Sequence, residues 1–170
     1  QALERARQEE KSDLGLYVLD ETLDNATIAK ADRIPLCQDT GVCVFFVRWG
    51  QECLLEGMAM QEAFDEAVRR AYQEGYLRKS LLKDPIFDRV NNGDNTPAFL
   101  HLKMIPGDQV EIAFLAKGAG ADNASQLKML KPGDGLEGVK KAIVSICEQA
   151  GADSCPPWIL GIGIGSTFDR

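Results

Sequence analysis

The feature that most constrains the fold is a helical pattern that directly follows a strand-like run. Apolar residues recur every three or four positions over Met58–Tyr76, which predicts an amphipathic helix, and Gly75 is expected to end it. Val42–Trp49 before it is a continuous apolar run rich in β-formers, as expected for a buried strand. Because each element must bury an apolar face, the two together predict helices packed on a sheet.

Two later segments alternate between apolar and polar residues, as half-buried strands do. Ala98–Met104 and Gln109–Ala116 lie on either side of the turn Pro106-Gly107-Asp108, and we expect them to form a hairpin or an adjacent pair of strands. Trp158–Ile164 is apolar and predicts a last buried strand that ends in glycines.

Further helices are expected at both ends of the chain. Residues 1–30 have helical character, with Ser12 as the cap of a second helix. Asp122 or Asn123 is expected to cap a short helix through Leu130, and Leu136–Ala150 predicts a longer one. The predicted fold class is therefore α+β (mixed α/β), with helices packed on a mixed, partly antiparallel sheet.

The composition indicates a single globular domain over residues 1–170, since 45% of the residues are hydrophobic and 26% are charged. No transmembrane segment or signal peptide is visible, and the start at Gln1 without a Met suggests a trimmed fragment. The net charge of −7 argues against nucleic acid or an anionic membrane as a partner. A few local Arg or Lys residues can still hold a small anion.

The cysteines are five in number and form no CxxC pair. This disfavours a secreted disulfide framework and structural zinc, and it predicts reduced thiols in the cytoplasm. We expect Cys43, Cys53 and Cys147 to serve as small buried apolar residues.

Two of the cysteines lie beside prolines in segments that do not resemble helix interiors. They are Cys37 in Pro35–Gly41 (PLCQDTG) and Cys155 in Ser154–Pro157. A thiolate presented from a turn binds soft metal centres, which favours an iron–sulfur cluster or zinc. We interpret both as ligands of part of an iron–sulfur cluster. The alternative for PLCQDTG is an ordinary loop closed by an Asx turn.

Other polar segments have both a functional and a structural interpretation. Lys117–Asn123 follows a strand and precedes a helix, where backbone amides bind anions, but a tight turn explains it equally well. Arg78 offers a fork suited to a carboxylate, whereas Asp94–Thr96 either bind a ligand or shape a turn. We interpret the glycines of Gly161–Gly165 as residues that allow the backbone to approach closely beside Cys155.

These motifs together resemble the class I fumarate hydratase and L-tartrate dehydratase family, most strongly the N-terminal part of its α subunit. Six blocks match in order, and with a weaker similarity at LDNA (23–26) the resemblance extends over nearly the whole chain. The blocks are PLCQDTG (35–41), YLRKS (76–80), NNGDNTPAFLH (91–101), KGAGADN (117–123), LKMLKP (127–132) and CPPWILGIGIGSTFD (155–169).

The resemblance implies a [4Fe–4S] cluster held by three cysteines, with one iron left open. Two of these ligands match Cys37 and Cys155, and the third is expected beyond residue 170. The loop KGAGADN departs from the pattern KGGGSEN, which is frequent in the family, at Ala119 and Ala121. The implied substrate-binding residues are Gln38, Asp39, Arg78, Gly118 and Gly120, of which Asp39 and Arg78 are also the candidate catalytic residues.

The activity implied by the resemblance is reversible addition or removal of water on a C4 dicarboxylate, either fumarate/malate or tartrate/oxaloacetate, with the open iron as Lewis acid. The implied partners are the small dicarboxylate and a C-terminal domain or β subunit, in a homo-oligomer such as a dimer. The catalytic base belongs to the absent part, so the isolated chain is expected to be inactive. The alternative is a non-enzymatic small-anion-binding or subunit-interaction domain.

Overall fold

The computed structural model describes residues 1–155, 157–165 and 167. The chain forms two compact units, residues 1–116 and 117–170, and each is described by itself. The elements of the first unit are α1 (Ala2–Glu9), α2 (Asp13–Asp32), β1 (Val42–Gly50), α3 (Met60–Glu74), β2 (Phe99–Ile105) and β3 (Val110–Lys117), whose last residue begins the second unit. The second unit also contains α4 (Ala119–Ala124), the 3-10 helix η1 (Pro132–Asp134) and α5 (Gly135–Ala150).

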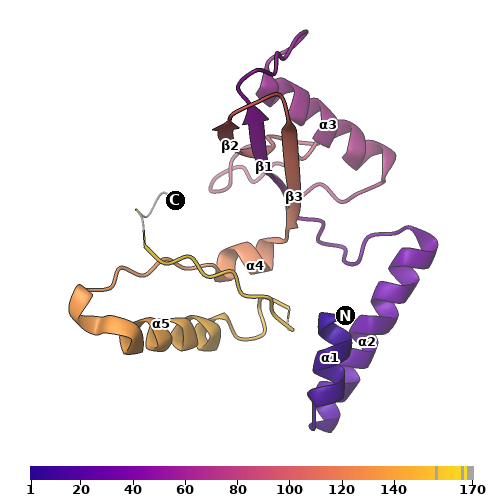
Figure 1. Cartoon of the computed structure of the whole chain (residues 1–170). Coiled ribbons are helices and arrows are strands. Elements are labelled where there is room, and N and C mark those ends of the chain that lie inside the picture. Colours follow the sequence, from indigo (N-terminus) through magenta and orange to yellow (C-terminus); the bar gives the residue numbers. More distant parts are fainter. Residues whose placement is uncertain (156, 166, 168–170) are drawn as a thin grey trace. The chain divides into compact units, whose positions relative to one another are not determined.

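The sheet of the first unit has the strand order β2-β1-β3 (Figure 1). β1 pairs in parallel with β2. Its pairing with β3 is antiparallel, because Arg48 forms an ion pair with Glu111 at 2.7 Å while Gly50 N–H donates to the Gln109 carbonyl at 2.8 Å. The predicted fold class, with a mixed and partly antiparallel sheet, is confirmed.

The expected hairpin of β2 and β3 is wrong, because β1 lies between these two strands. Their connection passes over the end of β1, where Gln51 N–H donates to the Ile105 carbonyl at 2.8 Å. A Cβ on Gly50 would lie 2.3 Å from the Gly107 carbonyl oxygen, so glycine is required at this crossing. The alternating pattern indicates which face of a strand is buried, but it does not indicate the neighbouring strand.

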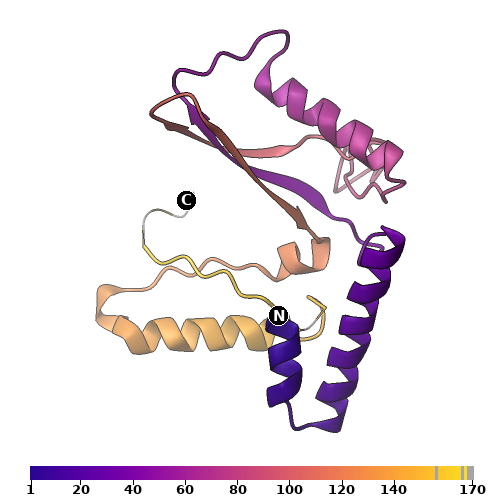
Figure 2. The ribbon, with the colours of Figure 1, turned by 45° about the vertical axis from the view of Figure 1, so that its right-hand side comes forward.

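α3 lies along one face of the sheet, as Figures 1 and 2 show. The predicted helix and its end at Gly75 are confirmed. Burial of each large apolar side chain contributes about 1.5–3 kcal/mol, so the apolar contact between α3 and the sheet stabilises the unit. Its buried residues are Cys43, Val68, Tyr72 and Ala98.

α1 and α2 form a helical pair joined by the Arg7–Asp20 ion pair. The predicted cap is confirmed, since the Ser12 hydroxyl oxygen accepts a hydrogen bond from Gly15 N–H at 3.2 Å. Capping satisfies an otherwise free amide at the helix start and contributes about 1 kcal/mol. α2 ends at Arg33, which has a left-handed φ of 54°.

Two sequence predictions are wrong in the second unit, whereas the long helix is confirmed as α5. α4 begins already at Ala119, so Asp122 lies inside it, and the Asp122 carboxylate pairs with Lys117 at 3.2 Å instead of capping. Residues 158–164 form no strand, and the side chain of Ile159 is 96% exposed. An apolar run becomes a strand only where a neighbouring strand accepts its backbone hydrogen bonds.

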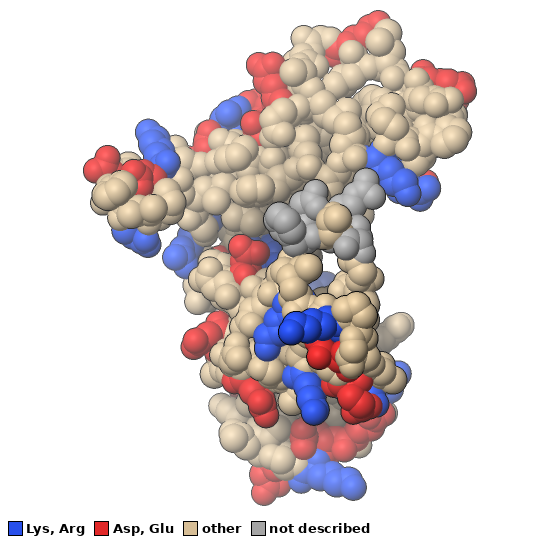
Figure 3. Space-filling view, turned by 90° about the vertical axis from the view of Figure 1, so that its left-hand side faces the viewer, with Lys and Arg blue, Asp and Glu red and all other residues tan. Residues whose placement is uncertain are grey.

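The surface has both charged and apolar areas. On the face in Figure 3, Lys and Arg side chains are interspersed with Asp and Glu. Among the described residues, no helix combines the length and apolar character needed to cross a membrane.

Candidate functional site

The first part of the candidate site is the turn between α2 and β1. Gly41 N–H donates to Asp39 Oδ1 at 3.0 Å, which is the Asx-type closure that the alternative interpretation predicts. The same turn leaves Cys37 exposed, and its Sγ accepts the Asp39 N–H at 3.4 Å. Upstream, Asn25 Nδ2 donates to the Leu36 carbonyl at 2.8 Å and ties the turn to α2.

The segment around Arg78 is hydrogen-bonded to this turn. The Thr40 hydroxyl donates to the Arg78 carbonyl at 2.7 Å, which joins residues that lie 38 positions apart. The Arg78 side chain is exposed. Its guanidinium forms no ion pair or hydrogen bond with any residue that the structure describes. A guanidinium in this state is available to a carboxylate ligand.

Tyr72 of α3 supports the turn from the core side. Its hydroxyl lies 3.0 Å from the Gly41 carbonyl oxygen and 3.1 Å from that of Thr40, and the Cys43 thiol donates to it at 3.7 Å. Burial raises the pKa of Tyr72 to about 12. Burial also raises the pKa of the Cys43 thiol. Cys43 is buried, as predicted, whereas Cys53 and Cys147 are only partly buried.

Tyr72→Phe is expected to lower the free energy of unfolding at pH 8 by about 1–2 kcal/mol, because Thr40 loses a hydrogen-bond donor. The wild-type folded state keeps Tyr72 protonated to about pH 12, whereas unfolding returns its pKa to about 10. Stability should therefore fall as pH rises between these values, and less steeply in the variant. Urea unfolding at both ends of the window tests this.

The matched control is Tyr17→Phe, because the Tyr17 side chain is 62% exposed. This variant should keep the wild-type stability and the wild-type pH dependence. An equally steep alkaline loss in Tyr72→Phe would contradict the role assigned to the buried hydroxyl.

The second part of the candidate site lies in the second unit. A Cβ on Gly120 would lie 2.6 Å from the Asp153 carbonyl oxygen, so the glycine loop closely approaches the segment that precedes Cys155. Gly118 precedes α4, and its carbonyl accepts the Asp122 N–H at 3.0 Å. Cys155 is exposed, with a left-handed φ of 55°. The adjacent Pro156 lies outside the described residues.

The predicted site residues thus fall into two groups. The first unit holds the turn with Cys37, Gln38 and Asp39 beside the Arg78 segment, and the second holds Gly118 and Gly120 beside the Cys155 segment. A cavity shared by Cys37 and Cys155 stays a prediction. Within the described part of the chain, no three His, Cys, Asp or Glu side chains lie together as a metal site.

Sequence reasoning missed the part played by Asn95. The sequence left open whether Asp94–Thr96 bind a ligand or shape a turn. Asn95 has 0% exposure, and its amide connects Gly41 to the amides of Ser80 and Leu81. The available signal was an Asn before a Thr-Pro pair in a stretch rich in Asn, Gly and Asp, where left-handed φ values such as its 61° are frequent.

Comparison with known proteins covers the whole chain, since residues 1–170 match the family model described as fumarate hydratase (Fumerase). The putative L(+)-tartrate dehydratase subunit alpha of Methanocaldococcus jannaschii is 38% identical over 173 residues, which include 99% of this chain and 60% of that protein. The L(+)-tartrate dehydratase subunit alpha of Escherichia coli K12 is 32% identical over 171 residues, 98% of this chain and 55% of its own length.

The chain therefore spans a little more than half the length of these relatives. The family match extends over every residue, and it follows that the chain belongs to the fumarate hydratase (Fumerase) family.

Proposed function

We propose that this chain is part of the α subunit of an iron–sulfur hydro-lyase that adds or removes water on a C4 dicarboxylate. The observation that carries the proposal is the hydrogen bond from Thr40 to the Arg78 carbonyl, which holds the thiol-bearing turn against the segment that carries the exposed Arg78 side chain. The family assignment supports the reaction class. The names of the relatives favour tartrate, and the family description favours fumarate.

The chemistry of the donors fits a [4Fe–4S] cluster at Cys37 and Cys155. Both thiols are exposed on turns, and Cys37 Sγ accepts a backbone amide, a bond that tunes cluster thiolates. Cys43 fits poorly, because it is buried and bonded to Tyr72. The third ligand would come from the rest of the longer protein. When bound, a cluster with an open iron supplies a Lewis acid that polarises a substrate oxygen.

The chain's own residues would bind and orient the substrate. Arg78 would hold one carboxylate through its planar fork, and the Gln38 amide would donate to an oxygen of the same ligand. Asp39, whose carboxylate is held by Gly41 N–H, would accept the hydrogen of a substrate hydroxyl. Backbone amides at Gly118 and Gly120 would bind carboxylate charge as it increases in the transition state.

We further propose that the chain works with a C-terminal domain or a β subunit, in a homo-oligomer. The relatives named subunit alpha support a second subunit. Exposed apolar side chains on the sheet are suited to such contacts, and they are Leu102, Met104, Ile112 and Phe114. The absence of disulfides among the five cysteines, all of them described, supports the reducing cytoplasm as the compartment.

The test uses the longer protein, assembled anaerobically with its partner and supplied with L-malate, fumarate or L-tartrate in turn. Turnover of at least one substrate is expected, together with an iron–sulfur absorption band. Residues 1–170 alone should show none, because a cluster ligand and the base lie elsewhere. The complex would instead be a small-anion-binding module if its cluster-containing form turned over none of the three substrates while its iron-free form still bound succinate.

Turnover by residues 1–170 alone would refute the proposed division of the site between this chain and the rest of the protein. Catalysis by an iron-free complex would refute the proposed cluster chemistry.

A further inference from the structure

Asn95 is a fully buried polar residue at the junction of the turn and the Arg78 segment. Its Oδ1 accepts hydrogen bonds from the backbone amides of Ser80 at 2.7 Å and Leu81 at 3.3 Å. Its Nδ2 donates to the Gly41 carbonyl at 3.0 Å. One side chain thus connects Gly41, which closes the Cys37–Asp39 turn, to the two residues that follow Lys79.

The pattern of donors and acceptors specifies an asparagine at this position. Two amide donors require an oxygen on one side, and a carbonyl acceptor requires an N–H on the other. An aspartate would place a carboxylate oxygen against the Gly41 carbonyl without a hydrogen between them. The left-handed φ of 61° further restricts the position to Asn, Asp or Gly at low cost.

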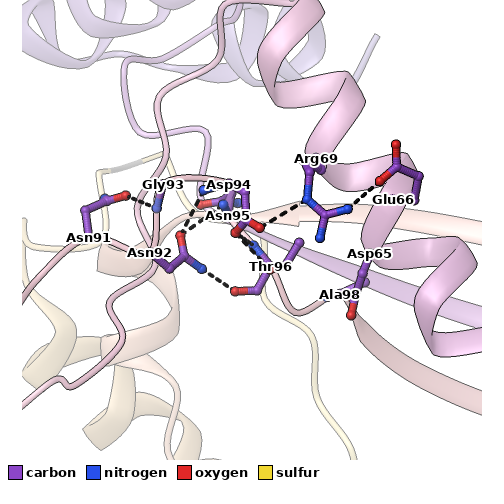
Figure 4. Close-up of polar contacts among 10 residues, drawn as sticks. All are labelled: Asp65, Glu66, Arg69, Asn91, Asn92, Gly93, Asp94, Asn95, Thr96 and Ala98. Atoms are coloured by element: carbon purple, nitrogen blue, oxygen red, sulfur yellow. Dashed lines mark hydrogen bonds and ion pairs between the residues drawn. The ribbon is translucent and has the colours of Figure 1, made fainter.

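The loop that carries Asn95 is itself anchored to α3. Figure 4 shows Arg69 of the helix reaching Asp94, at 3.2 Å between Nε and Oδ2. Burial acts to raise the pKa of the Asp94 carboxyl, but hydrogen bonds from Thr96 and Arg69 outweigh it and the pKa is lowered. Asn92 Oδ1 accepts the Asn95 N–H at 3.0 Å. The Asn95 side chain therefore projects from a loop held on a rigid element.

We propose that Asn95 is the positioning residue that sets Arg78 against the Cys37–Asp39 turn. This inference rests on the proposed hydro-lyase function. The Arg78 side chain is exposed and forms no hydrogen bond or ion pair with the described residues of the turn, so its location depends on the backbone on either side of it. Thr40 holds the Arg78 carbonyl, and Asn95 holds the two amides beyond Lys79. A displacement of about 1 Å in such a group lowers catalysis by about a hundredfold.

The experiment compares Asn95→Gly and Asn95→Asp in the longer protein with its partner. Glycine keeps the left-handed backbone and removes the amide, whereas aspartate keeps the acceptor and removes the donor. Both should lower kcat/KM by about 10- to 100-fold. The matched control is Gln61→Ala, which removes an amide hydrogen bond to the Ala98 carbonyl at 2.8 Å but leaves every contact of Asn95, and it should change kcat/KM less than about threefold.

A double-mutant cycle with Arg78→Lys separates positioning from general destabilisation. If Asn95 acts through Arg78, adding Asn95→Gly to Arg78→Lys should lower kcat/KM by less than about twofold more. If Asn95 were merely structural, the same factor would be lost in both backgrounds, and the proposal would be overturned. Wild-type kcat/KM in Asn95→Asp would also overturn it, because the Gly41 contact would then be dispensable.

A readout without turnover uses alkylation of Cys37 by iodoacetamide in the cluster-free complex. Succinate should slow this alkylation in the wild type, and the protection should be lost in Asn95→Gly at a temperature where circular dichroism shows both proteins folded. If Asn95→Gly does not fold, Asn95→Asp serves in its place. Absence of protection and turnover in the wild type counts against the proposed function, whereas equal protection in wild type and variant counts against the role of Asn95.

Discussion

Cys37→Ser and Cys155→Ser are each expected to lower the turnover of the assembled enzyme by at least about a thousandfold and to remove most of its iron–sulfur absorption. A serine hydroxyl is a hard and weakly acidic ligand, and soft thiolates are what iron–sulfur clusters require. If both thiols bind one cluster, the two substitutions should cause equal loss, even though the two cysteines belong to different compact units. Anaerobic reconstitution, iron analysis and absorption spectra would measure it.

The matched controls are Cys53→Ser and Cys147→Ser, both at partly buried positions. These variants should reconstitute a wild-type cluster and change turnover less than about threefold. Each substitution is expected to lower the free energy of unfolding slightly, and it removes no ligand of the cluster. If Cys37→Ser and Cys155→Ser reconstitute a normal cluster as well, the ligand assignment is wrong. A cluster lost in only one of the two would assign only that cysteine as a ligand.

Arg78→Lys is expected to lower kcat/KM by about a hundredfold, and Arg78→Ala by more. Lysine keeps the charge but loses the planar fork that binds both oxygens of a carboxylate. Loss of one such preorganised donor typically costs about 2.7–4 kcal/mol of transition-state stabilisation. Steady-state kinetics with the substrate identified by the activity assay would test it, and iron content should stay at the wild-type level.

Arg70→Lys is the matched control for Arg78→Lys. Arg70 is an exposed arginine on α3 whose ion pair with Glu74, at 3.4 Å, is a surface pair of small energetic value. Its replacement should leave kcat/KM within about twofold of the wild type. If Arg78→Lys behaves like Arg70→Lys, then Arg78 does not contact the substrate.

Much of the local structure could be predicted from side-chain periodicity. The run of β-formers in β1 and the helical spacing in α3 agree with the structure, and Gly75 and Ser12 indicated where helices end and begin. The strand expected at 158–164 failed for a general reason, because an apolar run says that a segment tends to be buried but does not provide a partner strand. The α4 prediction failed because Asp122 had an ion-pair partner, Lys117, that competes with capping.

The candidate site shows the same division. Cys37, Arg78 and the glycine loop could be singled out because their residue types bind metals, carboxylates and anions. Asn95 and Tyr72 could not be assigned their contacts, because a buried amide and a buried hydroxyl are recognised only by what surrounds them. The bond from the Thr40 hydroxyl to the Arg78 carbonyl was not predictable either, because it joins residues that lie 38 positions apart.

By itself, the sequence determined the long helices, the three strands of the sheet and the chemical types of the candidate site residues, because these follow from side-chain spacing and from the chemistry of single residues. Only the tertiary structure decided that β1 separates β2 from β3 and that Asn95 joins Gly41 to Ser80. Both are contacts between residues far apart in the chain. They depend on the balance of all backbone hydrogen bonds and buried surfaces at once, which no local pattern contains.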